Sequence, residues 1–222
     1  MKQKRFTFLL LFVANLFCAS AQKWYTPEID QKVEDLLKQM TVEEKLGYIG
    51  GVNWMYTKSI DRLGIHRMKM SDGPQGLGTD GKSTAYPSTV TLAATWNENL
   101  AYQYGKALGR DCRARNVNVI LGPAVNIYRA PMWGRNFEYM GEDPYLTSRI
   151  CVGYIKGVQD QGVMATVKHF VANNSDYDRN NISNDIDERT LNEIYFPAYK
   201  AAIQEAEVGA VMTSYNLMNG IY

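Results

Sequence analysis

The chain has 222 residues and a hydrophobic content of 45%, which is ordinary for a globular protein and sufficient for a packed core. Its net charge is +1, and the basic residues are interspersed with acidic ones, with no stripe that could follow a phosphate backbone. The composition therefore argues against nucleic-acid binding and gives no electrostatic reason to expect an anionic membrane as a partner.

The N-terminus has the pattern of a secretory signal peptide. Three basic residues precede a nearly continuous apolar run over 6–17, and Ala19-Ser20-Ala21 supplies a small-x-small cleavage pattern. The apolar run is shorter than the roughly 17–25 residues that span a bilayer. We therefore predict a cleaved signal over residues 1–21, a secreted or periplasmic protein, and no membrane insertion after cleavage. Cys18 could accept a lipid, but the bulky Phe17 before it disfavours a lipoprotein.

Helical and strand-like segments alternate along the remaining residues, 22–222. Pro27 in the first turn and a helical spacing of apolar residues predict a helix over 26–40. The capping-box pattern Thr41-Val42-Glu43-Glu44 predicts a second, short helix. Asn97 and Asp143 are candidates for capping later helices. Strands are expected at 68–71, 117–121, 163–167 and 210–213, and further helices at 97–115, 144–161 and 188–206.

Polar clusters follow the predicted strands, which bears on the fold class. Strands that alternate with helices predict a parallel α/β architecture. The loops after the strands of a TIM-type (β/α)8 barrel converge on one face, whereas an open sheet uses mainly one crevice. No Gly-rich dinucleotide or phosphate loop follows the first strand. We therefore predict a barrel. The clusters are Asp72, residues 126–142, Lys168-His169 and Tyr215-Asn216.

The loop over residues 134–145 combines one cation, three carboxylates and three aromatic side chains. Packed cores are not built from such a mixture, because each buried charge would need a partner, whereas a site for a polyhydroxylated ligand does need it. The planar guanidinium of Arg135 can bond two adjacent hydroxyls. The alternative for Arg135 is a salt bridge to Glu138, Glu142 or Asp143.

Two further clusters supply candidate ligand-binding side chains. Asp72 is followed by Gly73-Pro74, so it either presents its carboxylate at a strand tip or caps its own turn. Lys168 and His169 follow apolar residues and need a ligand or a carboxylate, although His169 could instead bond backbone beneath the barrel mouth. Trp133 is the best candidate for stacking on a sugar ring.

Metal and thiol chemistry are not expected. His66 and His169 are the only histidines, and no His/Asp/Glu spacing resembles a zinc or iron motif, so we predict no metal and no cofactor. Cys112 and Cys151 lie in helical segments beside apolar residues, which favours buried thiols, although an exported protein could also pair them. Trp96 opens a helix and is expected to pack.

Several motifs follow one another along the chain. They are Arg62-Leu63-Gly64-Ile65, Ser71-Asp72-Gly73-Pro74, Leu121-Gly122-Pro123 with Asn126-Ile127, Gly134-Arg135-Asn136-Phe137-Glu138 with Glu142-Asp143-Pro144, Lys168-His169-Phe170, Asp187-Glu188-Arg189 and Tyr215-Asn216. Together they resemble glycoside hydrolase family 3, in its secreted β-glucosidase branch. The resemblance runs from about Met40 to Tyr222, which is nearly all of the expected mature chain.

The resemblance implies a catalytic (β/α)8 barrel that hydrolyses terminal β-D-glucosyl or related β-glycosyl residues with retention, through a covalent glycosyl–enzyme. By the resemblance, Asp72, Arg135, Lys168 and His169 match positions that bind sugar hydroxyls, and Asp72 favours glucose over xylose. Tyr215 matches a position near the nucleophile. The substrate implied is a β-glucoside or an oligosaccharide.

The resemblance also implies which parts are not in this chain. The family's nucleophile is an aspartate in a Ser-Asp-Trp-like motif after the next strand, and its acid/base glutamate generally comes from a later domain. A retaining mechanism needs two such carboxyl groups. Neither matches a position before Tyr222. We therefore expect residues 22–222 to be the N-terminal part of an incomplete barrel, with no catalytic carboxylate and a C-terminal part of the same enzyme as its partner.

Two other functions stay open from the sequence. One is a catalytically inactive, sugar-binding or regulatory half-barrel. The other is an unrelated barrel lyase or aldolase, which would use Lys168, the one lysine in a strand-end cluster, as a Schiff base. A Ser-Asp-Trp motif in a continuing reading frame would favour the hydrolase over both.

Overall fold

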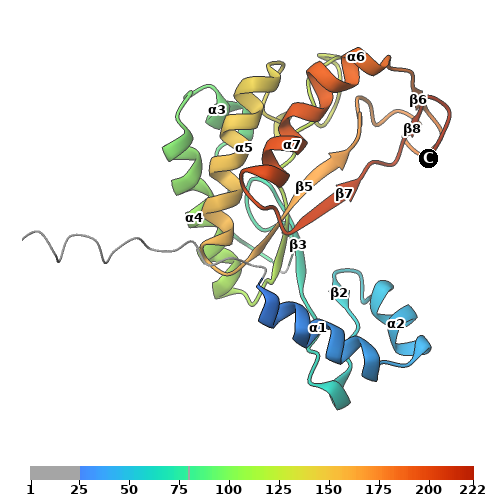
Figure 1. Ribbon diagram of the computed structural model, residues 1–222. Coiled ribbons are helices and arrows are strands. Elements are labelled where there is room, and N and C mark those ends of the chain that lie inside the picture. The colour runs from blue at the N-terminus through green and yellow to red at the C-terminus, as the bar shows by residue number, and fades with distance from the viewer. Residues whose placement is uncertain (1–25, 80) are drawn as a thin grey trace, which may run out of the picture. The chain divides into compact units, whose positions relative to one another are not determined.

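The computed structural model describes residues 26–79 and 81–222 (Figure 1). The predicted signal peptide and Cys18 lie outside these residues. The described residues form two units that meet between Thr41 and Val42 in the sequence. In the first unit, helix α1 (Pro27–Gln39) is capped by Thr26, whose hydroxyl accepts a hydrogen bond from the backbone of Ile29 at 3.3 Å. The helix predicted over 26–40 is therefore confirmed.

A four-stranded parallel sheet forms the centre of the second unit. Its order in space is β3 (Met70–Asp72), β4 (Val119–Leu121), β5 (Met164–Phe170) and β7 (Ala210–Thr213), the same as the order in the sequence. Sequential order is the rule in a (β/α) barrel, whereas a doubly wound sheet reverses its order at a switch point. The strand order therefore confirms the choice of a barrel-type α/β fold over an open sheet.

Three long helices connect the strands and lie side by side on one face of this sheet (Figure 1). They are α4 (Glu98–Ala114), α5 (Pro144–Gln159) and α7 (Phe196–Gln204). The carboxamide of Asn97 accepts the N–H three residues on at 3.0 Å, and the carboxylate of Asp143 does the same at 2.7 Å. Both predicted N-caps are confirmed, and α4 and α5 begin where the sequence placed them.

The helical segment predicted over 188–206 is confirmed over residues 188–204, with one π-helical turn inside it. Asp187 caps a short helix α6 (Glu188–Thr190), which continues as a π-helical turn (Leu191–Tyr195) before α7 begins. Pro197, the second residue of α7, has no N–H, and a proline ring clashes with the carbonyl four residues earlier in a regular helix. The wider turn ahead of Pro197 avoids that clash.

Short elements complete the second unit. Strands β1 (Gly51–Val52) and β2 (Tyr56–Thr57) form an antiparallel pair, and β6 (Ser183–Asn184) and β8 (Leu217–Met218) pair in parallel. The other short elements are α2 (Val42–Ile49), a 3-10 turn (Asp61–Leu63), α3 (Thr89–Ala93) and a second 3-10 turn (Asn136–Glu138).

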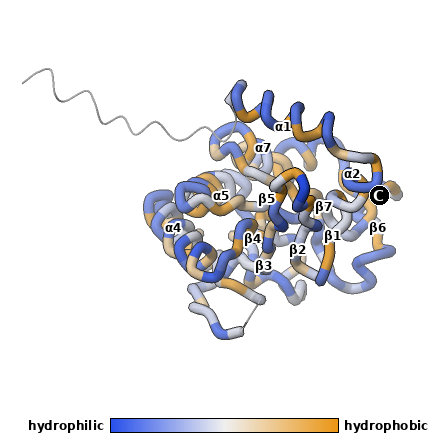
Figure 2. Tube along the Cα trace, turned by 90° about the horizontal axis from the view of Figure 1, so that it is seen from below, coloured by the Kyte–Doolittle hydropathy of each residue, from blue (hydrophilic) through white to orange (hydrophobic). Residues whose placement is uncertain are grey.

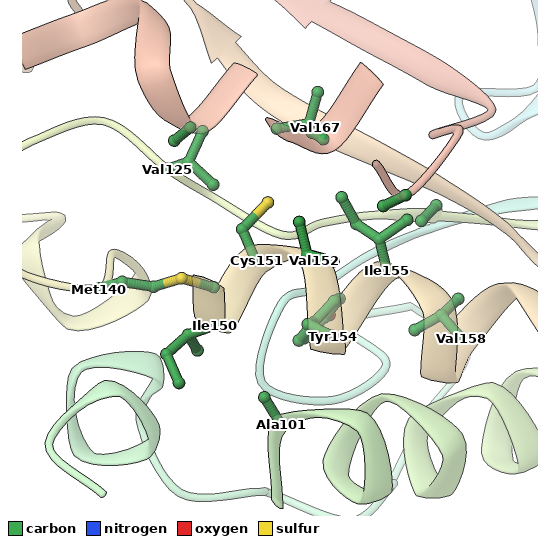
Figure 3. Packing of buried hydrophobic residues seen from close by; sticks show 14 of the residues in the cluster. Ala101, Val125, Met140, Ile150, Cys151, Val152, Tyr154, Ile155, Val158 and Val167 are labelled. Atoms are coloured by element: carbon green, nitrogen blue, oxygen red, sulfur yellow. The ribbon is translucent and has the colours of Figure 1, made fainter. Parts of the chain in front are cut away.

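The apolar core lies between the sheet and the helices, with α5 in its centre. Figure 3 shows Cys151 and Ile155 on the side of α5 that faces Val167 of β5, and Tyr154 near Ala101 of α4. Because α5 touches the sheet on one side and α4 on another, eleven of its sixteen residues are buried. Figure 2 shows more hydrophobic (orange) colour along α5 than along the outer helix α4, which is mostly hydrophilic (blue).

The two cysteines of the described segments belong to this core. Cys112 and Cys151 are free and buried, which confirms the buried-thiol interpretation and excludes a disulfide between them in this structure. Burial raises the pKa of the Cys112 thiol to about 12, with a smaller contribution from Asp111. Neither thiol is therefore ionised near neutral pH.

The strand ends differ from the sequence expectation at two places. β3 includes Asp72, and β5 extends through Lys168 and His169 to Phe170, three residues beyond the predicted end. The apolar pattern stops at Val167, but the backbone continues to pair because β7 supplies partners, with a register shift between Lys168 and Phe170. The polar side chains thus stand within the strands and not in loops after them.

Candidate functional site

A pocket of about 440 Å³ opens at the carboxyl ends of β3 and β5. Three of the five predicted site residues meet there, on three different segments of the chain. Segments 73–78 and 83–85, which follow β3, form much of the remaining wall. The charged and aromatic side chains in the wall are Asp72, Arg135, Phe137, Glu138 and Lys168.

Asp72 presents an uncommitted carboxylate to this pocket. The residue is exposed, and within the described part of the chain its carboxylate makes no hydrogen bond. The turn after it is closed by backbone, since the Gly78 N–H donates to the Asp72 carbonyl at 2.9 Å. The alternative that Asp72 caps its own turn is therefore wrong, and its oxygens are available to a ligand.

Glu138 lies between the two cations of the pocket. The Arg135 Nε donates to Glu138 Oε1, and the Lys168 Nζ lies 3.4 Å from Glu138 Oε2. Lys168 also donates to the Gly73 carbonyl at 3.1 Å, and Arg135 Nε lies 3.9 Å from a carboxylate oxygen of Asp176. Arg135 thus both lines the pocket and forms the salt bridge that was its alternative.

Burial decides the electrostatics of this group. Lys168 is 2% exposed and Glu138 is 4% exposed, so neither charge is solvated by bulk water. Desolvation lowers the pKa of Lys168, and the carboxylates of Glu138 and Asp72 act against that shift. The sequence analysis did not assign Glu138 to the site. Its spacing of three residues from Arg135 on a helical turn was the available signal, since such pairs face one another.

The backbone of His169 is held by two buried side chains. Its N–H donates to the Asn126 side-chain oxygen at 2.9 Å, and its carbonyl accepts from the Asn126 amide at 3.0 Å and from the Tyr199 hydroxyl at 2.6 Å. Asn126 follows β4 and Tyr199 lies on α7. These hydrogen bonds therefore connect the end of β5 to the segment after β4 and to helix α7. Asn126 both accepts from and donates to the His169 backbone, and so positions the end of β5.

The His169 ring lies behind the pocket wall, where it contacts Arg135. Its Nε2 is 3.2 Å from the Arg135 guanidinium, and its Nδ1 is 2.6 Å from the Tyr139 hydroxyl. A guanidinium only donates, so Nε2 accepts and the ring proton sits on Nδ1, donating to Tyr139. Burial, followed by the charges of Lys168 and Arg135, lowers the His169 pKa to about 2. The imidazole is therefore neutral. The other possibility raised from the sequence, a His169 side chain hydrogen-bonded to backbone, is wrong, because both ring nitrogens contact side chains.

Tyr215 is not brought to the other four residues. It lies two residues beyond β7, is 49% exposed, and contacts Arg179, whose guanidinium carbon is 4.4 Å from the ring centroid. The pocket wall does not include it. A role for Tyr215 at the sugar stays a prediction.

Two predictions about tryptophans are wrong. Trp133 is 5% exposed and packs on Tyr139, with ring centroids 4.5 Å apart, so it supports the wall from behind and cannot stack on a ligand. Trp96 is 70% exposed and not packed. Tyr139 was missed by the sequence analysis, although it contacts both Trp133 and His169. Phe137, 57% exposed in the pocket wall, is the aromatic side chain that a ligand can reach.

No group of three His, Cys, Asp or Glu side chains that could hold a metal ion occurs among residues 26–79 and 81–222. One free carboxylate, one guanidinium and one ammonium of the pocket can accept and donate charge-assisted hydrogen bonds to neighbouring hydroxyls.

Known proteins are similar to this chain in both sequence and fold. The model of the glycosyl hydrolase family 3 N terminal domain matches residues 36–221. Thermostable β-glucosidase B of Acetivibrio thermocellus is 44% identical over 202 residues, 86% of this chain and 27% of that protein. A β-glucosidase of Bacteroides ovatus is 45% identical over 212 residues, 89% of this chain and 28% of that protein.

A solved structure shows the same relationship in three dimensions. The β-glucosidase 3B of Thermotoga neapolitana, solved in complex with glucose, has a TM-score of 0.82 and 38% identity, over 86% of this chain and 30% of that chain. The chain thus spans little more than a quarter of the length of the curated relatives. The family model, the curated relatives and the shared fold agree: the chain belongs to glycosyl hydrolase family 3 and matches its N-terminal domain.

Proposed function

We propose that this chain supplies the sugar-binding part of an enzyme that hydrolyses terminal β-D-glucosyl residues. The observation that carries the proposal is the pocket in which the free carboxylate of Asp72 and the cations Arg135 and Lys168 line one wall. The names of the relatives, β-glucosidases in each case cited above, support the substrate class.

The charges of the pocket suit a sugar better than an anion or a cation. Asp72 accepts a hydrogen bond from a hydroxyl, whereas Arg135 and Lys168 donate to hydroxyl oxygens. The pocket therefore offers partners to both the donor and the acceptor of neighbouring sugar hydroxyls. Phe137 adds an apolar face near the opening, which fits the C–H face of a sugar ring. Binding by His169 and Tyr215, implied by the family resemblance, stays part of the proposal.

The pocket binds and orients; its carboxylates do not break the bond. A retaining glycosidase needs a nucleophile and an acid/base about 5–5.5 Å apart on either side of the glycosidic bond. Glu138 is committed to Arg135 and Lys168, and Asp72 is assigned to sugar hydroxyls. We propose that hydrolysis proceeds with retention, through two further carboxylates of the enzyme.

Hydrolysis can be tested on the full-length protein that carries this sequence. We expect turnover of a nitrophenyl β-D-glucoside, slower turnover of the β-xyloside, and the β-anomer of glucose as the first product in proton NMR. Glucose binding without any turnover would favour the inactive, sugar-binding alternative. First formation of the α-anomer would contradict the retaining mechanism.

We also propose that the protein is exported, with residues 1–21 removed. The basic start, the apolar run and the cleavage pattern support this proposal. Among the residues that the structure describes, no helix is long and apolar enough to cross a membrane. Mass spectrometry of the protein from culture medium or periplasm should give a chain that starts at Gln22. Recovery of the intact N-terminus from the cytoplasm would contradict export.

A further inference from the structure

The buried Lys168 and Glu138 and the partly buried Arg135 lie together in the wall of the proposed sugar site. Arg135 and Lys168 come from segments 33 residues apart, the loop before the 3-10 turn and strand β5. Glu138 contacts both with different oxygens, Oε1 with Arg135 and Oε2 with Lys168. It is the carboxylate that joins the two segments within the pocket wall.

We propose that Glu138 is a positioning residue, which holds Arg135 and Lys168 in place and keeps Lys168 charged so that both can bind sugar hydroxyls. The proposal deepens the proposed function and rests on it. Glu138 acts through its two partners, because both of its oxygens are occupied by them. The residue is therefore distinct from the sugar-binding side chains that it supports.

The charge balance around Lys168 shows why a carboxylate is needed at this position. The charged groups that act on the ammonium are Glu138 on the 3-10 turn, Asp72 at the end of β3 and Arg135 before the turn. Burial and Arg135 favour the neutral amine, whereas the two carboxylates favour the ammonium. Glu138 is the carboxylate within ion-pair distance, at 3.4 Å. Without its charge the pKa of Lys168 falls further.

Geometry adds a second requirement. Lys168 is held by the Gly73 carbonyl and by Glu138, and the loss of either leaves its long side chain with fewer fixed contacts. Within the described residues, Arg135 then keeps its longer contact to Asp176 and its bond to His169. Donors that are free to move lose the preorganisation on which tight hydroxyl binding depends.

The test uses Glu138→Gln in the full-length enzyme, with glucose binding measured by calorimetric titration across pH and kcat/KM for a nitrophenyl β-glucoside measured at neutral pH. A glutamine has the same shape and removes the charge. We expect kcat/KM at neutral pH to fall about ten- to a hundredfold. We also expect the alkaline limb of the glucose-binding profile to move to lower pH, because the ammonium is lost earlier.

Matched variants separate this role from a general effect on folding. Glu142→Gln, an exposed carboxylate of the same loop, should leave both the rate and the alkaline limb unchanged. In a Lys168→Met background, Glu138→Gln should produce no further shift of the limb. An unshifted limb in a folded Glu138→Gln enzyme, or a shift that persists without Lys168, would overturn the proposal.

Two further arms keep the outcome decisive. If Glu138→Gln does not fold, Glu138→Asp carries the test: the charge stays, so the limb stays, while kcat/KM falls because the shorter side chain cannot reach both cations. A moved limb would contradict the proposal. If the wild-type enzyme shows no turnover, the proposed function fails, and calorimetric titration of the same variants with glucose across pH tests Glu138 by the same shift in binding.

Discussion

Replacing Asp72 with alanine is expected to lower kcat/KM for a β-glucoside by about one to two orders of magnitude, with the fold intact. The loss equals one charge-assisted hydrogen bond to a hydroxyl, about 1.5–3 kcal/mol, and is greater if that bond tightens in the transition state. The fold survives because the Asp72 side chain is exposed and makes no hydrogen bond within the described part of the chain. Steady-state kinetics and a melting curve measure both effects.

The matched control is Asp61→Ala, which removes an exposed carboxylate outside the pocket wall and should change neither quantity. Asp72→Asn should keep part of the activity, because the amide still offers one acceptor oxygen. Wild-type turnover by a folded Asp72→Ala enzyme would remove this residue from the site. A large fall in the melting temperature would instead give Asp72 a structural role that its exposure does not suggest.

The largest effect on stability is expected for Gly157→Ala, on the face of α5 that meets α4. A Cβ at this position would lie 2.1 Å from the Tyr102 carbonyl oxygen and 2.7 Å from the Lys106 nitrogen, both of them backbone atoms of α4. Alanine in a helix normally stabilises by about 0.5–1 kcal/mol relative to glycine. Overpacking costs about 1–3 kcal/mol, and backbone atoms cannot move aside as a side chain can. The overpacking term therefore wins.

We expect the free energy of unfolding to fall by about 2 kcal/mol or more for Gly157→Ala, measured by chemical or thermal denaturation. Gly50→Ala is the control, since the nearest atoms to its Cβ would be at an ordinary 3.8 Å. Equal stabilities of the two variants would show that α4 and α5 do not approach as closely as Gly157 indicates.

The elements of the fold were accessible from the sequence where one physical signal dominates. The caps Asn97 and Asp143 fixed the starts of α4 and α5, and the apolar run over 210–213 gave β7 with its correct bounds. Periodicity failed where polar residues continue a strand. Lys168 and His169 extend β5 because Glu138 and Tyr139, remote in sequence, supply the partners that make their burial tolerable.

The site was accessible in part, for the same reason. Asp72 and Lys168 stood out as charged residues at the ends of apolar strands, and Arg135 as the cation of a loop rich in carboxylates and aromatic side chains. The structure brings the three to one pocket. Glu138 was hidden among several acids of one loop, where its spacing of three residues from Arg135 was the signal that could have distinguished it. Trp133 was misjudged because an aromatic side chain in a polar loop can equally pack behind it, as this one does against Tyr139.

We propose that the pocket at the carboxyl ends of β3 and β5 holds the glucosyl unit. The decisive measurement is a crystal structure of the full-length enzyme with bound glucose. We expect sugar hydroxyls at about 2.7–3.2 Å from the Asp72 carboxylate, the Arg135 guanidinium and the Lys168 ammonium. An ordered glucose bound elsewhere, with only water between these three side chains, would contradict it.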